Sequence, residues 1–321
     1  MIASNQKSEN EKIRRCEDKN KKIGLLNFST SQPLNFSLLL LTVYCLLFTV
    51  ACGHMPPKLS DTHLRAIEFN QKAGSAFKKG DYKKALHLYS EALMINRSIE
   101  NSDGIAINLI NMAIVYRKLG EGDKAHKHID ELFNYSPFTI HHSLLSEAAF
   151  IKAMLYLDDV NYEYASQWVD RALSFCQNDR CSMEGKIYNL KGRIALLRGD
   201  PSSAITFGNK GLMLNKACED REEIANSLRL LAGAKAMRGE YEEAMKSYRD
   251  ALATDKSLGL SRKVAIDLIG IGNVLFKQGE LEDALKYFKR ALSVSEGAED
   301  KQGIKDATIM IEKCLKDLEK K

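Results

Sequence analysis

The sequence predicts an all-α solenoid of about six helix–turn–helix repeats, closed by a capping helix. An alanine returns at intervals of 39 or 40 positions, and each opens an amphipathic run such as KKALHLYSEAL or EDALKYFKRAL. Five residues earlier stands a glycine in five copies and Val160 in the third. Such recurrence indicates units that stack, because one unit cannot bury its apolar face alone. The recurrent alanines are Ala85, Ala125, Ala165, Ala204, Ala244 and Ala284.

The first helix of each unit is predicted from small and large residues that share one face. With the recurrent alanine counted as position twenty, position eight is always alanine or glycine, as in Ala113 and Gly272. Position four is mostly large and apolar, as in Leu109 and Leu228. Spacings of three and four residues place these side chains on one helical face. The glycine at position fifteen then ends the helix, since it adopts a left-handed backbone without a Cβ clash.

The second helix carries the recurrent alanine and a larger residue four positions later, such as Tyr89 or Phe288. Another small residue follows seven positions after the alanine in most copies, which lets two helices approach closely. Residues 300–321 have apolar positions among many charges, which is typical of the polar-backed capping helix that a solenoid needs. Those apolar positions are Ile304, Ala307, Ile311, Leu315 and Leu318.

This pattern resembles the tetratricopeptide (TPR) repeat over residues 66–298. The shared features are small residues at positions eight, twenty and twenty-seven, glycine at fifteen, an aromatic residue near twenty-four, and Pro137 at the end of the second copy. The resemblance implies a right-handed superhelix. The period exceeds the usual one of about 34 residues. It is therefore similar to the longer-helix TPR subgroup, whose members commonly bind peptides or protein segments.

The resemblance also implies where a partner binds, because the first helices of TPR arrays line a concave groove. Positions two, five, nine, twelve and thirteen face that groove. The clamp for chaperone C-terminal carboxylates needs lysine and asparagine at positions five and nine, but Asn70 and Gly74 stand there, so we do not expect that clamp. The expected groove residues are Asn70, Phe77, Arg117, Phe150, Met154, Asn189, Arg193, Arg229, Asn273 and Phe276.

The first 51 residues are typical of an export signal with a long basic leader. Seven basic and four acidic residues occupy positions 1–22, and the apolar run FSLLLLTVYCLLFTVAC follows. That run is short for a membrane-spanning helix, which needs about 20 apolar residues. Ala51-Cys52-Gly53 resembles a bacterial lipobox, although Thr49 departs from the usual leucine.

The resemblance to a lipobox implies that Cys52 is lipidated and that residues 52–65 link it to the array. An uncleaved anchor and a plain signal peptide are the alternatives for this segment. Gly53 rather than aspartate after Cys52 favours the outer membrane of a Gram-negative cell, facing the periplasm. Translation could also start later, near Leu25.

Two cysteines flank the turn between the third and fourth copies, and a third cysteine lies at the end of the fourth copy. Cys176 and Cys181 could form a local disulfide in an oxidising periplasm, with Cys218 as a competing partner. Free structural thiols are an equally supported alternative. No CxxC redox spacing and no zinc ligand set accompany these cysteines.

Charge and motifs indicate a binding protein rather than an enzyme. The formal charge is +5, of which +3 belongs to residues 1–22, so the array is nearly neutral, unlike a nucleic-acid binder. Residues 23–51 contain no charged side chain. No phosphate loop, HExxH motif or nucleophile elbow is present. We therefore expect no catalysis, no cofactor and no metal.

The leading hypothesis is a lipid-anchored scaffold of the bacterial cell envelope that holds a protein or peptide in its groove. The alternative is a regulator that binds a peptide signal and changes its superhelical shape. The sequence does not identify the partner or the pathway.

Overall fold

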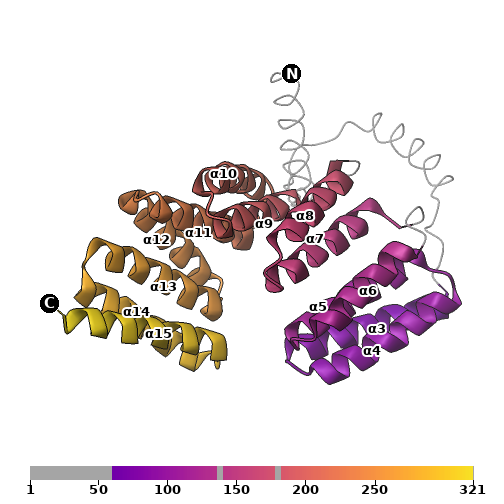
Figure 1. Cartoon of the computed structure of the whole chain (residues 1–321). Coiled ribbons are helices and arrows are strands. Elements are labelled where there is room, and N and C mark those ends of the chain that lie inside the picture. Colours follow the sequence, from indigo (N-terminus) through magenta and orange to yellow (C-terminus); the bar gives the residue numbers. More distant parts are fainter. Residues whose placement is uncertain (1–59, 136–139, 178–181, 321) are drawn as a thin grey trace, which may run out of the picture.

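The computed structural model describes residues 60–135, 140–177 and 182–320, and these residues form thirteen helices and no strand. The expected all-α solenoid of six helical hairpins and a final capping helix is confirmed (Figure 1). The expected export signal of residues 1–51, the expected lipidation site Cys52 and Pro137 lie outside the described residues.

Each hairpin pairs a first and a second helix of 13–18 residues. The helices in order are α3 (Asp61–Lys78), α4 (Tyr82–Ser98), α5 (Ser102–Lys118), α6 (Gly122–Asn134), α7 (His142–Asp158), α8 (Tyr162–Gln177), α9 (Glu184–Leu197), α10 (Pro201–Ala217), α11 (Arg221–Met237), α12 (Tyr241–Ser257), α13 (Ser261–Gln278), α14 (Leu281–Gly297) and α15 (Lys301–Leu318).

Left-handed turns separate the two helices of every hairpin, as the glycine pattern predicts. The five glycines at position fifteen have φ between 75° and 83°. Val160 adopts the same conformation, with φ of 59°, although its branched Cβ makes that region unfavourable. The fold therefore imposes the turn on the third unit even without glycine.

The recurrent small residues allow the close contact between helices. All six recurrent alanines have 0% exposure. A Cβ on Gly272 would lie 2.5 Å from the ring of Phe288, and one on Gly192 would lie 2.6 Å from Leu230. Position eight is thus small because a large side chain of a facing helix fills the space above it.

Contacts between units give the array its curvature. The first helices of successive units pack on one another, as in α3 with α5, α5 with α7 and α11 with α13, whereas second helices of successive units do not pack to this extent. Because the first helices lie closer together, they form the inner side of the arch seen in Figure 1. The step from α7 to α9 lacks such packing.

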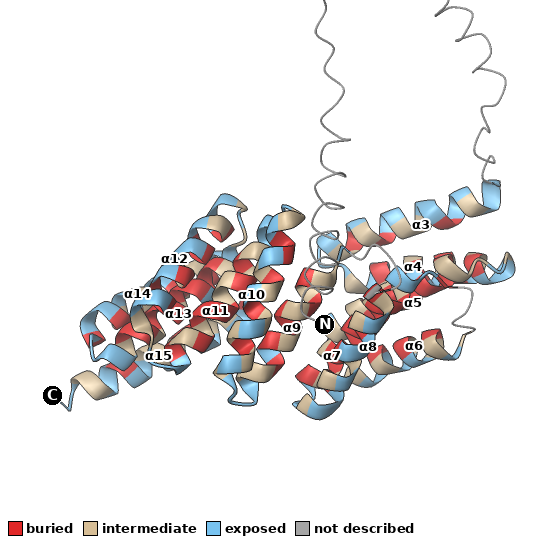
Figure 2. Cartoon of the chain, turned by 90° about the horizontal axis from the view of Figure 1, so that it is seen from above, coloured by how far each residue is buried: buried red, intermediate tan, exposed pale blue. Residues whose placement is uncertain are grey.

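Burial follows the same arrangement, with buried residues on the faces where helices meet (Figure 2). One continuous core extends from α3 into α9, and a second extends from the end of α11 to α15. In α15, Ala307 and Cys314 are buried, whereas Leu315, which the sequence placed on the apolar face, is largely exposed. Among the described residues, no helix has the length and apolarity needed to cross a bilayer.

Candidate partner-binding groove

We call the surface formed by positions two, five, nine, twelve and thirteen of the first helices the inner groove. Large aliphatic side chains remain accessible there at positions two and thirteen. Leu197 and Met237 are 47% and 49% exposed, values that would be unusual for residues of the solenoid core. The other accessible aliphatic residues at these positions are Ile67, Ile107 and Ile266.

Two basic groups of the inner groove are crowded by surrounding protein atoms. Arg193 and Lys118 are exposed, yet crowding by protein atoms lowers the pKa of each side chain. The charges of Arg262 and Asp300, from the far end of the array, also act on Lys118. A side chain that is reachable by solvent but poorly hydrated stands inside a concave surface, because walls on several sides displace bulk water.

Arg117 lies in the inner groove and joins two units. Its Nε and Nη2 atoms donate to the two carboxylate oxygens of Asp158, at 2.5 and 3.0 Å, which links α5 to α7. This bidentate arrangement fixes the guanidinium plane. The charges of Asp158 and Arg117 both act on Arg193 of α9, so these three side chains share one region of the groove.

The predicted aromatic groove residues are partly engaged within the array. Phe150 is buried beneath the ammonium group of Lys186, 5.1 Å from the ring centre, and Phe276 lies under Lys313 of α15 at 5.0 Å. Phe77 is half-buried, with its ring 5.6 Å from that of Tyr82. Met154 and Asn273 are half-buried on α7 and α13.

Three predicted groove residues at position five instead occupy polar junctions between units. Asn70 accepts a hydrogen bond from Asn108 Nδ2 at 2.6 Å, and Asn108 accepts one from Asn96 at 2.8 Å. This chain of amides joins α3, α4 and α5. Asn70 therefore already has an internal partner, and its contact with a ligand stays a prediction.

The same junction recurs twice with different residues. Asn189 accepts from the hydroxyl of Ser227 at 2.7 Å, and Ser227 accepts from Asn215 at 3.1 Å. In each case the three residues are separated by 26 and then 12 positions, because they occupy positions five and thirty-one of one unit and position three of the next. The sequence analysis missed this pattern, which a search for polar residues at that double spacing finds.

The third junction is charged. Arg229 donates to Asp267 at 2.6 Å and also to Asp255, and both carboxylate side chains have 0% exposure. Burial, together with the nearby Asp255 carboxyl, raises the pKa of Asp267 to about 6, although Arg229 acts to lower it. Burial also raises the pKa of Tyr248 to about 12. Arg229 is thus committed to holding α11, α12 and α13 together.

The cysteines at the third boundary show a different junction. Cys176 occupies position thirty-one of the third unit, and its Sγ atom lies 3.1 Å from the hydroxyl oxygen of Ser146. Cys176 and Cys218 are both disulfide-bonded. Cys181 lies outside the described residues, so the pairing of Cys176 with Cys181 stays a prediction.

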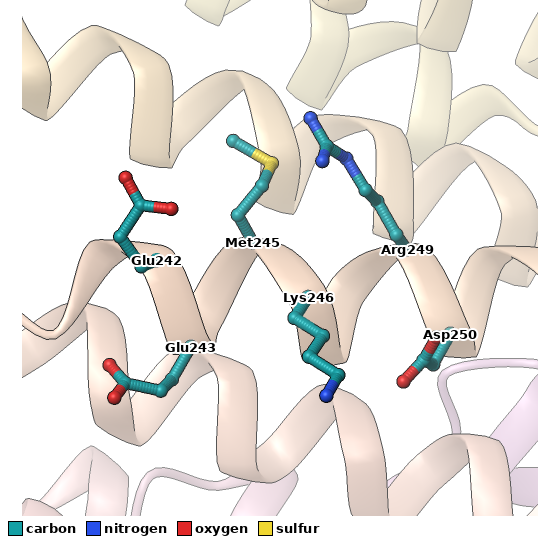
Figure 3. Close-up of a pocket in the computed structure, with 6 residues that line it drawn as sticks. All are labelled: Glu242, Glu243, Met245, Lys246, Arg249 and Asp250. Atoms are coloured by element: carbon teal, nitrogen blue, oxygen red, sulfur yellow. The ribbon is translucent and has the colours of Figure 1, made fainter.

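Elsewhere on the described surface, an open hollow follows α12 (Figure 3). All its lining residues belong to that one helix, and they combine three acids, two bases and Met245. A wall built by a single helix cannot enclose a ligand. No cluster of three or more metal-binding side chains occurs within residues 60–135, 140–177 and 182–320.

Comparison with known families agrees with the repeat geometry. Family models of the tetratricopeptide repeat match residues 65–134 and 265–297. The chain contains tetratricopeptide repeats. The first match covers the first and second hairpins, and the second match covers the sixth hairpin. No curated protein matches the chain.

Solved structures with the same architecture include several TPR proteins. The Cut9–Hcn1 assembly of APC/C has a TM-score of 0.62 at 14% identity, over 85% of this chain and 46% of that chain. The chain thus spans less than half of that relative. NprR in complex with its cognate peptide NprX has a TM-score of 0.58 at 17% identity, over 81% and 74% of the two chains. A Rap protein complexed with Competence and Sporulation Factor has 0.58 at 14%, over 75% and 68%.

Proposed function

We propose that this TPR array is a non-catalytic scaffold that binds a peptide or protein segment in its inner groove, and that a lipid on Cys52 anchors it in the bacterial cell envelope. The observation that carries the groove function is the row of accessible aliphatic side chains at positions two and thirteen. Exposed apolar residues gathered on one concave surface are typical of interaction sites.

The inner groove suits an extended or helical segment for a physical reason. Aliphatic side chains offer apolar contact area to a ligand. Charged side chains that have lost part of their hydration form strong polar contacts with it. Two proteins of similar architecture were solved with ligands, NprR in complex with its cognate peptide NprX and a Rap protein complexed with Competence and Sporulation Factor. These relatives support the proposal as analogies of fold.

The envelope location rests on the sequence of residues 36–53. A basic leader, a short apolar run and the Ala51-Cys52-Gly53 tripeptide suit export followed by lipidation. An acyl chain gives membrane attachment that scales with its buried methylene groups. We place the array at the outer membrane, on its periplasmic side.

The groove function is tested by recovering partners from intact membranes. Ile107→Asp and Met237→Asp place a charge on positions of the inner groove at which the side chains are 39% and 49% exposed. Met94→Asp and Met213→Asp are matched controls, because these methionines are exposed on the second helices. We expect the groove variants to lose proteins that co-purify with the wild type after cross-linking, and the controls to keep them. Equal recovery by both pairs would contradict the groove function.

A further inference from the structure

The inner groove is strongly basic although the array as a whole is nearly neutral. Setting aside Arg229, which its two aspartates neutralise, the groove positions carry six basic side chains and two acidic ones. The basic residues are Lys78, Arg117, Lys118, Lys186, Arg193 and Lys277, and the acidic residues are Glu147 and Asp158. A concave surface with low-dielectric walls concentrates such a field.

Among the described residues, Arg193 is the one groove arginine without a counter-ion, and the groove lysines Lys78, Lys118 and Lys277 also lack one. Arg193 is exposed at position nine of α9, and it forms no ion pair or hydrogen bond with any described residue. The one carboxylate whose charge attracts it, Asp158, already accepts both of its hydrogen bonds from Arg117. Crowding lowers the pKa of Arg193, so part of the hydration of its guanidinium is already lost.

Two arginines and one committed aspartate leave an excess positive charge at this point of the inner groove. Lys118, the neighbour of Arg117 in sequence, adds a further positive charge beside it. Aliphatic side chains flank the arginines on the same helices, with Leu197 accessible one turn after Arg193 and Ile107 accessible at the start of α5. A ligand that fits here combines a negative group with apolar residues on either side.

We propose that Arg193, with Arg117 beside it, forms a carboxylate-binding subsite at the middle of the inner groove, and that the array selects peptides in which a carboxylate is flanked by aliphatic residues. The inference rests on the groove function proposed above and specifies its partner. The planar guanidinium of Arg193 donates two parallel hydrogen bonds to the carboxylate. The basic leader of this chain, with charge +3 over residues 1–22, is not complementary to this surface.

The carboxylate could belong to an aspartate or glutamate side chain or to a peptide C-terminus. Random twelve-residue peptides with amidated C-termini, and the same library with free C-termini, separate the two sources. Each library is incubated with the full-length protein in mild detergent, and bound peptides are sequenced. Arg193→Gln removes the charge and keeps most of the side-chain volume. Arg249→Gln, on the exposed face of α12, is the matched control.

We expect wild type and Arg249→Gln to enrich aspartate and glutamate over asparagine and glutamine, and Arg193→Gln to lose that enrichment. An individual selected peptide should bind Arg193→Gln about tenfold more weakly or worse, since hydrogen bonds to charged groups contribute strongly. Binding confined to the free C-terminus library, with no enrichment of acidic side chains, would assign the subsite to a terminal carboxylate.

Two results would overturn the reasoning at different levels. Peptides that bind equally well from both libraries without enrichment of aspartate or glutamate would reject the carboxylate subsite and leave the groove function standing. No peptide binding by the wild type, in either library, would contradict the groove function itself.

Discussion

The charged junction between the fifth and sixth units predicts a pH dependence of stability that one substitution removes. Asp267 and Asp255 are buried against a single arginine, so two ionised carboxylates leave one negative charge uncompensated in the interior. The raised pKa of Asp267, about 6 against 3.8 in an unfolded chain, means that the folded state binds this proton more tightly. The stability that the proton contributes is therefore complete below pH 3.8 and is lost as the pH rises through 6.

The magnitude follows from the size of the shift. A difference of about two pKa units between the folded and unfolded states changes the free energy of unfolding by about 3 kcal/mol between the low and high limits of pH. Between pH 5 and pH 7.5 about half of this is expected, roughly 1 to 2 kcal/mol, because the unfolded state has already lost most of its proton at pH 5. This window avoids the carboxylates whose pKa values are lowered, such as that of Glu222, because their effect lies at lower pH.

Asp267→Asn keeps the shape and the hydrogen-bonding oxygen but cannot ionise. We expect the free energy of unfolding of the wild type to fall relative to that of Asp267→Asn by roughly 1 to 2 kcal/mol between pH 5 and pH 7.5, measured by urea denaturation. The difference between the two proteins cancels histidine contributions. Burial lowers the pKa of His128, for example, which reduces stability as pH falls in both proteins.

Asp250→Asn serves as the control, since Asp250 is exposed on α12 and outside the junction. This control should follow the wild type at both pH values. A difference in the free energy of unfolding between wild type and Asp267→Asn that stays constant from pH 5 to pH 7.5 would refute the claim that Asp267 holds a proton in the folded state.

Four further outcomes follow from the structure. Val160→Gly should raise the free energy of unfolding by about 0.5 to 1 kcal/mol, because glycine removes the backbone strain of the left-handed turn and the exposed Val160 side chain contributes little packing. A lower midpoint in urea for the variant would count against strain at this position. Gly272→Ala should destabilise the fold by about 1 kcal/mol or more, because the added Cβ clashes with Phe288. Gly74→Ala should stabilise the fold slightly, because its Cβ would only contact the Tyr89 hydroxyl at 3.8 Å. Thermal melts that rank the two variants in the opposite order would reject the packing argument. Palmitate labelling should be lost in Cys52→Ala, and equal labelling of both proteins would end the lipoprotein proposal. Solution scattering with a selected peptide should leave the radius of gyration unchanged if the array is a rigid scaffold, and a clear change would favour the peptide-sensing regulator.

The repeat period was predictable because backbone geometry fixes the residues that carry it. A left-handed turn needs glycine at position fifteen, and close helix crossings need alanine or glycine at positions eight and twenty, so these signals recur in almost every unit. The sequence pattern placed Leu315 on the apolar face of α15, but it does not decide which face of the last helix packs on the array. That helix packs through Ala307 and Cys314 instead.

The groove residues were less predictable because one repeat position serves two purposes. Position five was expected to face a partner, but Asn70, Asn189 and Arg229 contact the next unit. Whether a polar residue there is free depends on its neighbours at positions thirty-one and three, which lie far away in sequence. Arg193 at position nine has no such neighbour and remains available.

The most direct test of the account is photo-cross-linking in intact cells from single positions of the array. A photoreactive amino acid at Ile107, on the inner groove, is compared with one at Met94, on a second helix, because both side chains are accessible. The account predicts discrete adducts from position 107 that are absent from position 94 and that are lost when Arg193→Gln is added. Adducts that are the same from both positions, or found only at position 94, would contradict the claim that the inner groove holds the partner.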